Sequence, residues 1–195
     1  MGIPSSDTGR RAAIFAAAKA LIRERGLSEV RTRDVTERAG VGIGLLNHYF
    51  RWQALRAEAA VAALEEEIER VFPTAAAPGA VLTGFVKQAF TERSAPLWRL
   101  WIETTDAALT DEEMSKALAS CAVGLLERVA STLDAGSRLA LWSCPNPRAS
   151  AMRILALHDG LAGFVLTGIP PLSRAEATAH LKAQVNQECG RNVVA

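Results

Sequence analysis

Apolar residues recur at intervals of three or four along most of the chain, which is the spacing of amphipathic α-helices. The pattern predicts a first helix from about Gly9 to Arg25, with Ile14, Ala18 and Leu21 on its buried side. A second, longer stripe predicts a helix over about 52–72. The sequence between these two stripes is short and contains its own helix signals.

The stretch from 32 to 50 predicts two short helices joined by a tight turn. Thr32 can cap the first helix, and Gly40 can end it in a left-handed conformation. Gly42 can cap the next helix, in which Leu46 and Phe50 lie four apart and face inward. The residues left to face outward are Ile43, Gly44, Asn47 and His48. Such a helix suits a recognition helix entering a DNA major groove, and the alternative is a plain helical hairpin.

Capping signals divide the rest of the chain into further helices. Thr110–Glu113 and Ser173–Glu176 have the spacing of capping boxes, and Asn146–Pro147 reads as a cap followed by a first-turn proline. A loop is expected over 134–144. The predicted helices are about 80–92, 96–109, 110–132, 146–166 and 173–189. With the earlier segments they predict an all-α fold of about nine helices.

Composition agrees with a helical, globular chain. Of 195 residues, 49% are hydrophobic, and Tyr49 is the only tyrosine. The length allows one or two small domains with a real core. We predict domains over 1–55 and 56–195, with the helix at about 52–72 bridging them.

Charge is unevenly distributed along the chain. Residues 1–60 hold ten Lys/Arg and six Asp/Glu, a net +4, whereas residues 61–195 hold twelve and fifteen, a net −3. A positive N-terminal third attracts a phosphate backbone, although chance asymmetry is the alternative. Arg10 and Arg11 lie at the start of the first predicted helix, where the helix dipole does not favour cations. They could bind an external anion such as a DNA phosphate, or they could be ordinary solvated side chains.

Several classes of protein are excluded by what the sequence lacks. There is no secretory signal, and the longest apolar region, Ile154–Leu166, is broken by His158 and Asp159. The three cysteines are widely spaced, without metal-ligand pairing. We therefore expect a cytoplasmic protein with reduced thiols, no bound metal and no membrane contact.

An enzyme is also disfavoured. The histidines, at 48, 158 and 180, fall in no triad or metal spacing, and no glycine-rich phosphate loop is present. His158 and Asp159 are adjacent, so on a helix they point in different directions. We expect neither catalysis nor a cofactor.

Residues 11–55 resemble the DNA-binding segment of the TetR family of bacterial transcriptional regulators. The matching residues are Asp34-Val35, Arg38-Ala39-Gly40-Val41, Gly44, Leu46, His48-Tyr49-Phe50 and Ala54-Leu55. The segments PLWRLWIE and LALHDGLAGFVLTG resemble the BetI-type branch of that family. The resemblance implies an N-terminal three-helix DNA-binding domain with a helix-turn-helix, followed by a C-terminal helical domain for ligand binding and dimerisation.

The resemblance also implies which residues contact DNA. They are Thr32, Arg33, Gly42, Ile43, Gly44, Leu45, Asn47, His48, Tyr49, Arg51 and Gln53. Asn47 replaces the family's usual tyrosine, and its amide can bond adenine in a bidentate fashion. Gln53 replaces a lysine that grips phosphate, and Arg51 is the neighbouring candidate for that contact. A place in the core is an open alternative for Leu45, and His48 and Tyr49 could contact phosphate or pack the helix end rather than read bases.

Two further partners are implied by the resemblance. A homodimer would form through the helices at about 146–166 and 173–189, the alternative being that 146–166 is the buried central helix of a monomer. BetI-like regulators are associated with choline, and an aromatic, acidic pocket could bind such a cation. Its candidate residues are Trp98, Trp101, Glu103, Trp142 and Asp159, which could equally be core packing.

The sequence thus predicts a repressor that a small-molecule effector releases from a palindromic DNA operator. The alternative is a helical, dimeric ligand-binding module that no longer recognises DNA. The effector, the operator sequence, the target genes and the choice between repression and activation are not specified by the sequence.

Overall fold

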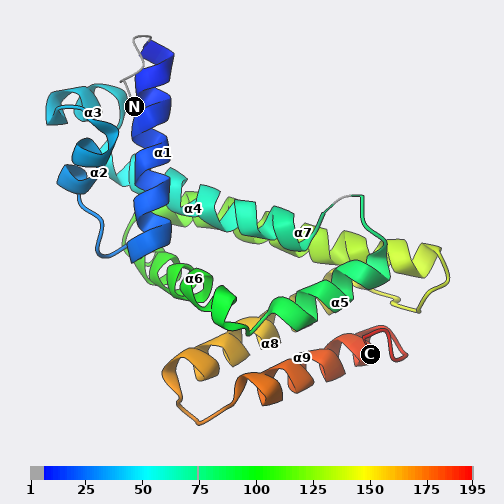
Figure 1. Cartoon of the computed structure of the whole chain (residues 1–195). Helices are drawn as coiled ribbons and strands as arrows, with labels where there is room; N and C mark the ends of the chain where they lie inside the picture. The colour runs from blue at the N-terminus through cyan, green and yellow to red at the C-terminus, as the bar shows by residue number, and fades with distance from the viewer. Residues whose placement is uncertain (1–6, 74, 195) are drawn as a thin grey trace. The chain divides into compact units, whose positions relative to one another are not determined.

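The computed structural model describes residues 7–73 and 75–194, which form nine α-helices and one short 3-10 helix (Figure 1). The helices are α1 (Asp7–Arg25), α2 (Thr32–Ala39), α3 (Ile43–Tyr49), α4 (Trp52–Val71), α5 (Pro78–Gln88), η1 (Glu92–Ser94), α6 (Ala95–Ala108), α7 (Glu112–Arg138), α8 (Pro147–Thr167) and α9 (Arg174–Glu188). The predicted all-α fold is confirmed.

Contacts between residues group the chain into two compact units. The first unit contains Met1–Glu66 and Arg99–Cys121, and the second contains Glu67–Trp98 and Ala122–Ala195. The division falls within α4, α6 and α7, so each of these helices contributes residues to both units. The units differ from the predicted domains because 56–66 and 99–121 group with the N-terminal helices.

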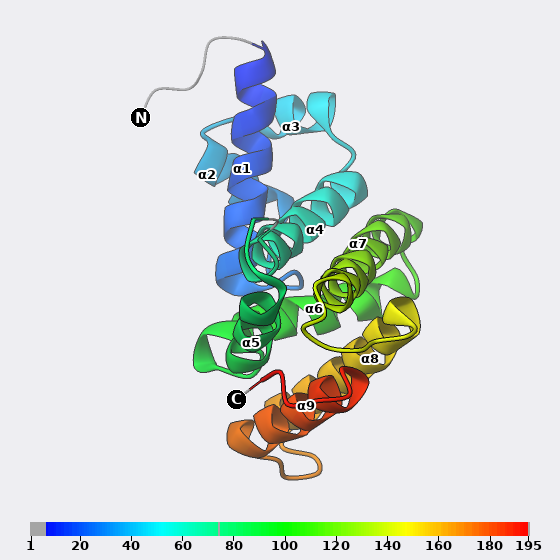
Figure 2. The same cartoon turned by 90° about the vertical axis from the view of Figure 1, so that its right-hand side faces the viewer.

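The core of the first unit is built around α1. Helix α1 packs against α2 and α3, and α2 packs against α3, as both views show (Figures 1 and 2). The side chains of Ile14, Leu21, Val35 and Leu46 are almost completely removed from solvent. Burying aliphatic side chains of this size stabilises a fold by about 1.5–3 kcal/mol each, so these residues fix the relative placement of α1, α2 and α3.

In the second unit, α8 and α9 lie side by side, and α5 contacts α9 (Figures 1 and 2). Leu82 of α5, Ile154 of α8 and Leu181 of α9 are fully buried. Each comes from the apolar stripe of its helix, which is the reason these three helices pack together.

Several predicted helix ends are confirmed. Gly40 ends α2 with φ of +66°, a left-handed conformation, and Gly42 is the N-cap of α3. The side chain of Asn146 accepts a hydrogen bond from the backbone N–H of Ala149 at 3.2 Å, as expected for the cap of α8. Ser173 and Glu176 form the predicted capping box at the start of α9.

Two other predicted caps are wrong. The N-cap of α2 is Arg31 rather than Thr32, and its backbone N–H donates to the Asp34 carboxylate at 2.8 Å. At the start of α7, Asp111 rather than Thr110 accepts the backbone N–H groups, from Glu113 at 3.0 Å and Met114 at 3.1 Å. In both places a carboxylate close by in sequence bonds the free backbone donors, which displaces the expected threonine.

Helix α7 also runs further than predicted, through Arg138 into the expected loop over 134–144. The cause is Trp142, whose buried indole folds back along the helix and donates from Nε1 to the Leu133 carbonyl at 2.8 Å. The indole lies directly against Gly136, where a side-chain carbon would overlap the ring. The last turn of α7 is therefore stabilised by a residue outside it.

Helix α8 bears on the expectation that the protein does not contact a membrane. By length and composition, Pro147–Thr167 is apolar enough to cross a bilayer, although 39% of its most apolar window is buried within the protein. The core helix of a globular protein passes the same test, so α8 alone is weak evidence for a membrane span.

Substitution of Gly136 tests the packing at the end of α7. We expect Gly136→Ala to lower the free energy of unfolding by about 1–3 kcal/mol, because the added methyl group must displace the Trp142 ring. Urea denaturation followed by circular dichroism measures this change.

Gly124 is the matched control, because it lies in the same helix and a methyl group there meets nothing within 4 Å. Gly124→Ala should raise stability by about 0.4–1 kcal/mol. Equal effects of the two substitutions would contradict the packing of Trp142 described above.

Candidate nucleic-acid interface

The predicted recognition helix, α3, rests on a buried apolar base. Leu46 is fully buried and Phe50 nearly so, and Val35 of α2 lies in the same core. The turn before α3 is closed by a backbone hydrogen bond from Val41 N–H to the Thr36 carbonyl at 3.0 Å. These contacts leave one side of α3 without a place in the core.

That outer side of α3 is open to solvent. Ile43 is 51% exposed, although large apolar side chains usually avoid water. Asn47 and His48 are also exposed. A methyl group at Gly42 or Gly44 would meet nothing within 4 Å, so no neighbouring element covers the start of the helix. A flat surface of this kind can approach the floor of a major groove closely.

Leu45 and Tyr49 are half-buried, intermediate between groove contact and core. The Tyr49 hydroxyl donates a hydrogen bond to Oδ1 of Asp7, and this bond raises the pKa of Tyr49. The Tyr49 ring meets His48 edge-on, with centroids 5.0 Å apart. Tyr49 thus joins the end of α3 to the start of α1.

The predicted anion site at the start of α1 is partly occupied by contacts within the protein. The guanidinium of Arg11 lies over the Phe50 ring, 4.7 Å from its centroid, in a cation–π arrangement. Arg11 therefore has a structural partner on the same short segment that ends α3.

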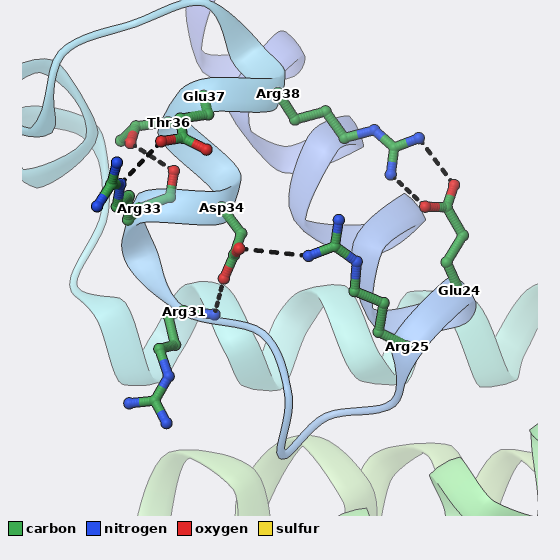
Figure 3. Close-up of polar contacts among 8 residues, drawn as sticks. All are labelled: Glu24, Arg25, Arg31, Arg33, Asp34, Thr36, Glu37 and Arg38. Atoms are coloured by element: carbon green, nitrogen blue, oxygen red, sulfur yellow. Dashed lines mark hydrogen bonds and ion pairs between the residues drawn. The ribbon is translucent and has the colours of Figure 1, made fainter.

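A network of ion pairs surrounds α2, and Figure 3 shows it. The guanidinium of Arg38 donates two hydrogen bonds to the Glu24 carboxylate at the end of α1, and the bond from Nη2 to Oε1 is 2.8 Å long. Arg25 donates to Asp34 at 3.3 Å, and Arg33 donates to Glu37 at 2.8 Å. The bond from Arg38 lowers the pKa of Glu24, so both partners are charged at neutral pH.

These ion pairs give the arginines of the first unit different roles. Arg38 joins α2 to α1 through Glu24, so it supports the fold. Within the described part of the chain, Arg33 pairs with Glu37 of its own helix, and its side chain is 87% exposed. An exposed pair of this type contributes little to stability, so a DNA phosphate can compete for Arg33.

The remaining predicted phosphate contacts lie at the two ends of the helix-turn-helix. Thr32 is half-buried in the first turn of α2, and Gln53 is exposed near the start of α4. Arg51 lies between α3 and α4 with its side chain 80% exposed, 3.6 Å from the Glu113 carboxylate of α7. Glu113 was predicted only as part of a capping box, because nothing in its local pattern indicates a partner 62 residues earlier in the chain.

The predicted effector residues fall into both units, and several have structural partners. Trp98 is buried and donates from Nε1 to the Ala89 carbonyl at 2.7 Å, while Trp142 packs on Gly136 as described above. Trp101 is half-buried in the first unit. Glu103 accepts hydrogen bonds from the backbone of Leu27 and Ser28. For Trp142 and Glu103 these contacts favour a structural role.

Trp98 instead belongs to an aromatic cluster that the sequence analysis missed. His158 is buried among Trp98, Phe85 and Phe90, with ring centroids 4.4, 4.7 and 5.6 Å away. Burial lowers the pKa of His158, although Asp159 acts in the opposite direction. The His158 Nδ1 lies 3.5 Å from Asp159 Oδ1 and makes no hydrogen bond within the described part of the chain. The spacing of these residues in sequence gives no signal of this cluster.

Burial limits the reactivity of the cysteine thiols. All three cysteines are free and buried, and burial raises the pKa of Cys121 to about 11. A thiol with this pKa remains protonated at neutral pH and is a poor nucleophile. Among residues 7–73 and 75–194, no group of three or more His, Cys, Asp or Glu side chains could hold a metal ion.

Comparisons with known proteins agree with this geometry. Residues 14–51 match the family described as bacterial regulatory proteins of the tetR family, and residues 78–190 match the C-terminal region of BetI-type transcriptional repressors. No curated protein matches the chain. The protein therefore belongs to the TetR family of transcriptional regulators, in its BetI-type branch.

Solved structures show the same fold. A regulator assigned to the TetR family from Rhodococcus sp. is 24% identical, with a TM-score of 0.75 over 92% of this chain and 98% of that one. A transcriptional regulator from Saccharomonospora viridis, crystallised with choline, is 21% identical, with a TM-score of 0.69 over 92% and 96%. GusR of Salmonella enterica is 12% identical, with a TM-score of 0.69 over 97% and 100%.

Gly44 tests whether the outer side of α3 approaches a ligand closely. In the free protein, Gly44→Ala should raise the free energy of unfolding by up to about 1 kcal/mol, because the site is open and alanine favours a helix. If the backbone lies close to DNA, the same methyl group should weaken DNA binding. Denaturation and fluorescence anisotropy with double-stranded DNA measure the two effects, and unchanged DNA affinity would exclude close approach at this residue.

Proposed function

We propose that this protein is a transcriptional repressor that binds a palindromic DNA operator as a homodimer and leaves it when a small-molecule effector binds. The observation that carries this proposal is the exposed outer side of α3, with Ile43, Asn47 and His48 presented on a fully buried base. An amide and an apolar side chain on one short helix can read adenine and a thymine methyl group in the major groove.

The positive residues near α3 support the same proposal. Arg33 and Arg51 both have highly exposed side chains in weak ion pairs, and they flank the helix in sequence. Phosphate contacts on both sides of a recognition helix fix its register on the duplex. Gln53 carries no charge, so we expect Arg51 to take the place of the lysine usual in this family.

Helices α8 and α9 provide the surface for the proposed dimer. Met152 is 56% exposed and Phe164 is 41% exposed, and Ala156 and Gly160 continue the same exposed line on α8 at intervals of four residues. On α9, Ala175, Ala179 and Ala183 are exposed at the same interval. Two helices with small and apolar outer residues can pack closely against their copies in a second subunit.

We place the effector near the aromatic cluster of the second unit. Trp98 and Phe90 stack with their planes 15° apart, and His158, uncharged at neutral pH because of its lowered pKa, adds a third ring. The carboxylate of Asp159 follows directly in sequence. Aromatic faces and a nearby carboxylate favour a cationic ligand, and the S. viridis structure contains choline. Choline is therefore the first compound to test.

Selection from random double-stranded DNA tests operator binding directly. We expect the full chain to enrich a palindrome whose half-sites lie about one helical turn apart. The logarithm of its affinity should fall steeply with the logarithm of salt concentration, because cations are released from the phosphates. Asn47→Ala should reduce discrimination at one base pair per half-site by about 1–3 kcal/mol.

Asn186→Ala is the control for this substitution, because Asn186 binds the backbone of Val193 and Val194 in the second unit. It should leave base preference unchanged. Failure to enrich any palindrome would favour the alternative function, a dimeric ligand-binding module that does not recognise DNA.

A charge placed on α8 tests the proposed dimer. We expect Gly160→Glu to shift the protein from dimer to monomer in sedimentation velocity, because a buried, unpaired carboxylate opposes association. Gly124→Glu is the control, since Gly124 is an equally open glycine on α7. A wild-type protein that sediments as a monomer would overturn the dimer.

A further inference from the structure

The turn that joins α1 to α2 is bonded to a side chain far away in sequence. Glu103 of α6 accepts hydrogen bonds through Oε2 from the backbone N–H of Leu27 and from that of Ser28 at 3.3 Å. Its other oxygen, Oε1, accepts from the Ser28 hydroxyl at 3.3 Å. One carboxylate therefore binds three donors of one turn, and charge-assisted bonds of this kind are stronger than neutral ones.

The backbone of the turn is shaped to receive this carboxylate. Gly26 has φ of +92°, a left-handed conformation that favours glycine. A side-chain carbon at Gly26 would lie 2.9 Å from Oε1 of Glu103, closer than real contacts allow. Successive backbone N–H groups next to a left-handed residue form a concave site for an anion. Glycine is favoured here by the backbone conformation, and a larger residue would also force the Glu103 carboxylate to move.

Of the two backbone donors, that of the exposed Ser28 can bond water, whereas that of Leu27 is buried. Leu27 is only 2% exposed, so its N–H is poorly placed to bond water if Glu103 is removed. Buried backbone donors are nearly always paired in native proteins. The carboxylate therefore satisfies this donor and bonds the turn that leads into α2 to α6.

A second acidic side chain contacts the other end of the helix-turn-helix. Glu113 of α7 lies 3.6 Å from Arg51, which follows α3. Glu103 and Glu113 both belong to the segment 99–121, which groups with the N-terminal helices. The carboxylates of this one segment thus contact the turn before α2 and the turn after α3.

We propose that Glu103 is the positioning residue of the DNA-binding head, by which we mean α1, α2 and α3. It sets the orientation of α2 and α3 by binding the α1–α2 turn to α6. Its consequence for DNA rests on the proposed function: a head of fixed orientation distinguishes operators by the separation of their half-sites, and a released head tolerates several separations. Glu103 touches the protein backbone and is not itself placed at the DNA.

Hydrogen–deuterium exchange on the full-length chain tests the positioning role without DNA. In Glu103→Gln, the amides of Leu27 and Ser28 should exchange at least about tenfold faster, and α2 and α3 should follow, because opening of this turn becomes easier. Helices α8 and α9 should keep their protection. Glu112→Gln is the control, since it removes the same charge from α7 at an exposed pair with Lys116.

Unchanged exchange at Leu27 and Ser28 would overturn the proposal. An equal acceleration in every helix would also overturn it, because that pattern describes general destabilisation rather than loss of one contact. Glu103→Ala provides a second variant that cannot accept any of the three hydrogen bonds, and it should show the same local pattern.

The DNA consequence is measured with the palindrome selected by the wild-type protein and with versions carrying one or two inserted base pairs between half-sites. Glu103→Gln should bind the selected palindrome about tenfold more weakly, and its preference over the lengthened versions should shrink by a similar factor. Retained preference would contradict the role of Glu103 in spacing. If wild type selects no DNA, the proposed function fails, while hydrogen exchange still decides the positioning role.

Discussion

A helix of seven residues is not stable in water through its own hydrogen bonds, and α3 exists because Leu46 is buried. The first unit depends on this constraint. Leu46 and Phe50 must face the core formed with α1 and α2, so the opposite side of α3 is left for contacts outside the protein. The same burial that stabilises the helix therefore determines which of its residues can bind DNA.

Electrostatics in the first unit serves the fold as well as binding. Arg38 connects α2 to α1 through Glu24, and Arg25 reaches Asp34, which also bonds the backbone of Arg31 (Figure 3). A count of charges along the sequence cannot separate these arginines from Arg33 and Arg51, whose side chains are far more exposed. The net charge of this region therefore does not indicate which of its cations are available to phosphate.

The sequence allowed the fold to be predicted well wherever local signals act alone. Gly40, Asn146 and Ser173 ended or capped their helices as expected, because each acts on backbone groups within a few residues. The predictions were wrong where another side chain bonded the same backbone groups or packed against the end of the helix. Asp34 and Asp111 displaced the expected threonine caps, and Trp142 extended α7 by packing on Gly136.

The candidate sites follow the same rule. The recognition helix was predictable because its exposed and buried positions alternate with a helical period. The proposed effector residues were not, since His158 meets Phe85 and Trp98 only through the folding of three helices. Glu103, predicted as a ligand residue from its place beside two tryptophans, instead bonds a turn 76 residues earlier in the chain.

The discontinuous first unit has a consequence for synthesis on the ribosome. Its N-terminal part ends at Glu66, but the unit also requires Arg99–Cys121, including the carboxylate that binds the α1–α2 turn. Domains generally fold as their residues emerge, and contacts between distant residues form late. The first unit therefore cannot reach its final form until residue 121 has been made, which is more than half of the chain. By then α5 and the beginning of α7 have also been made.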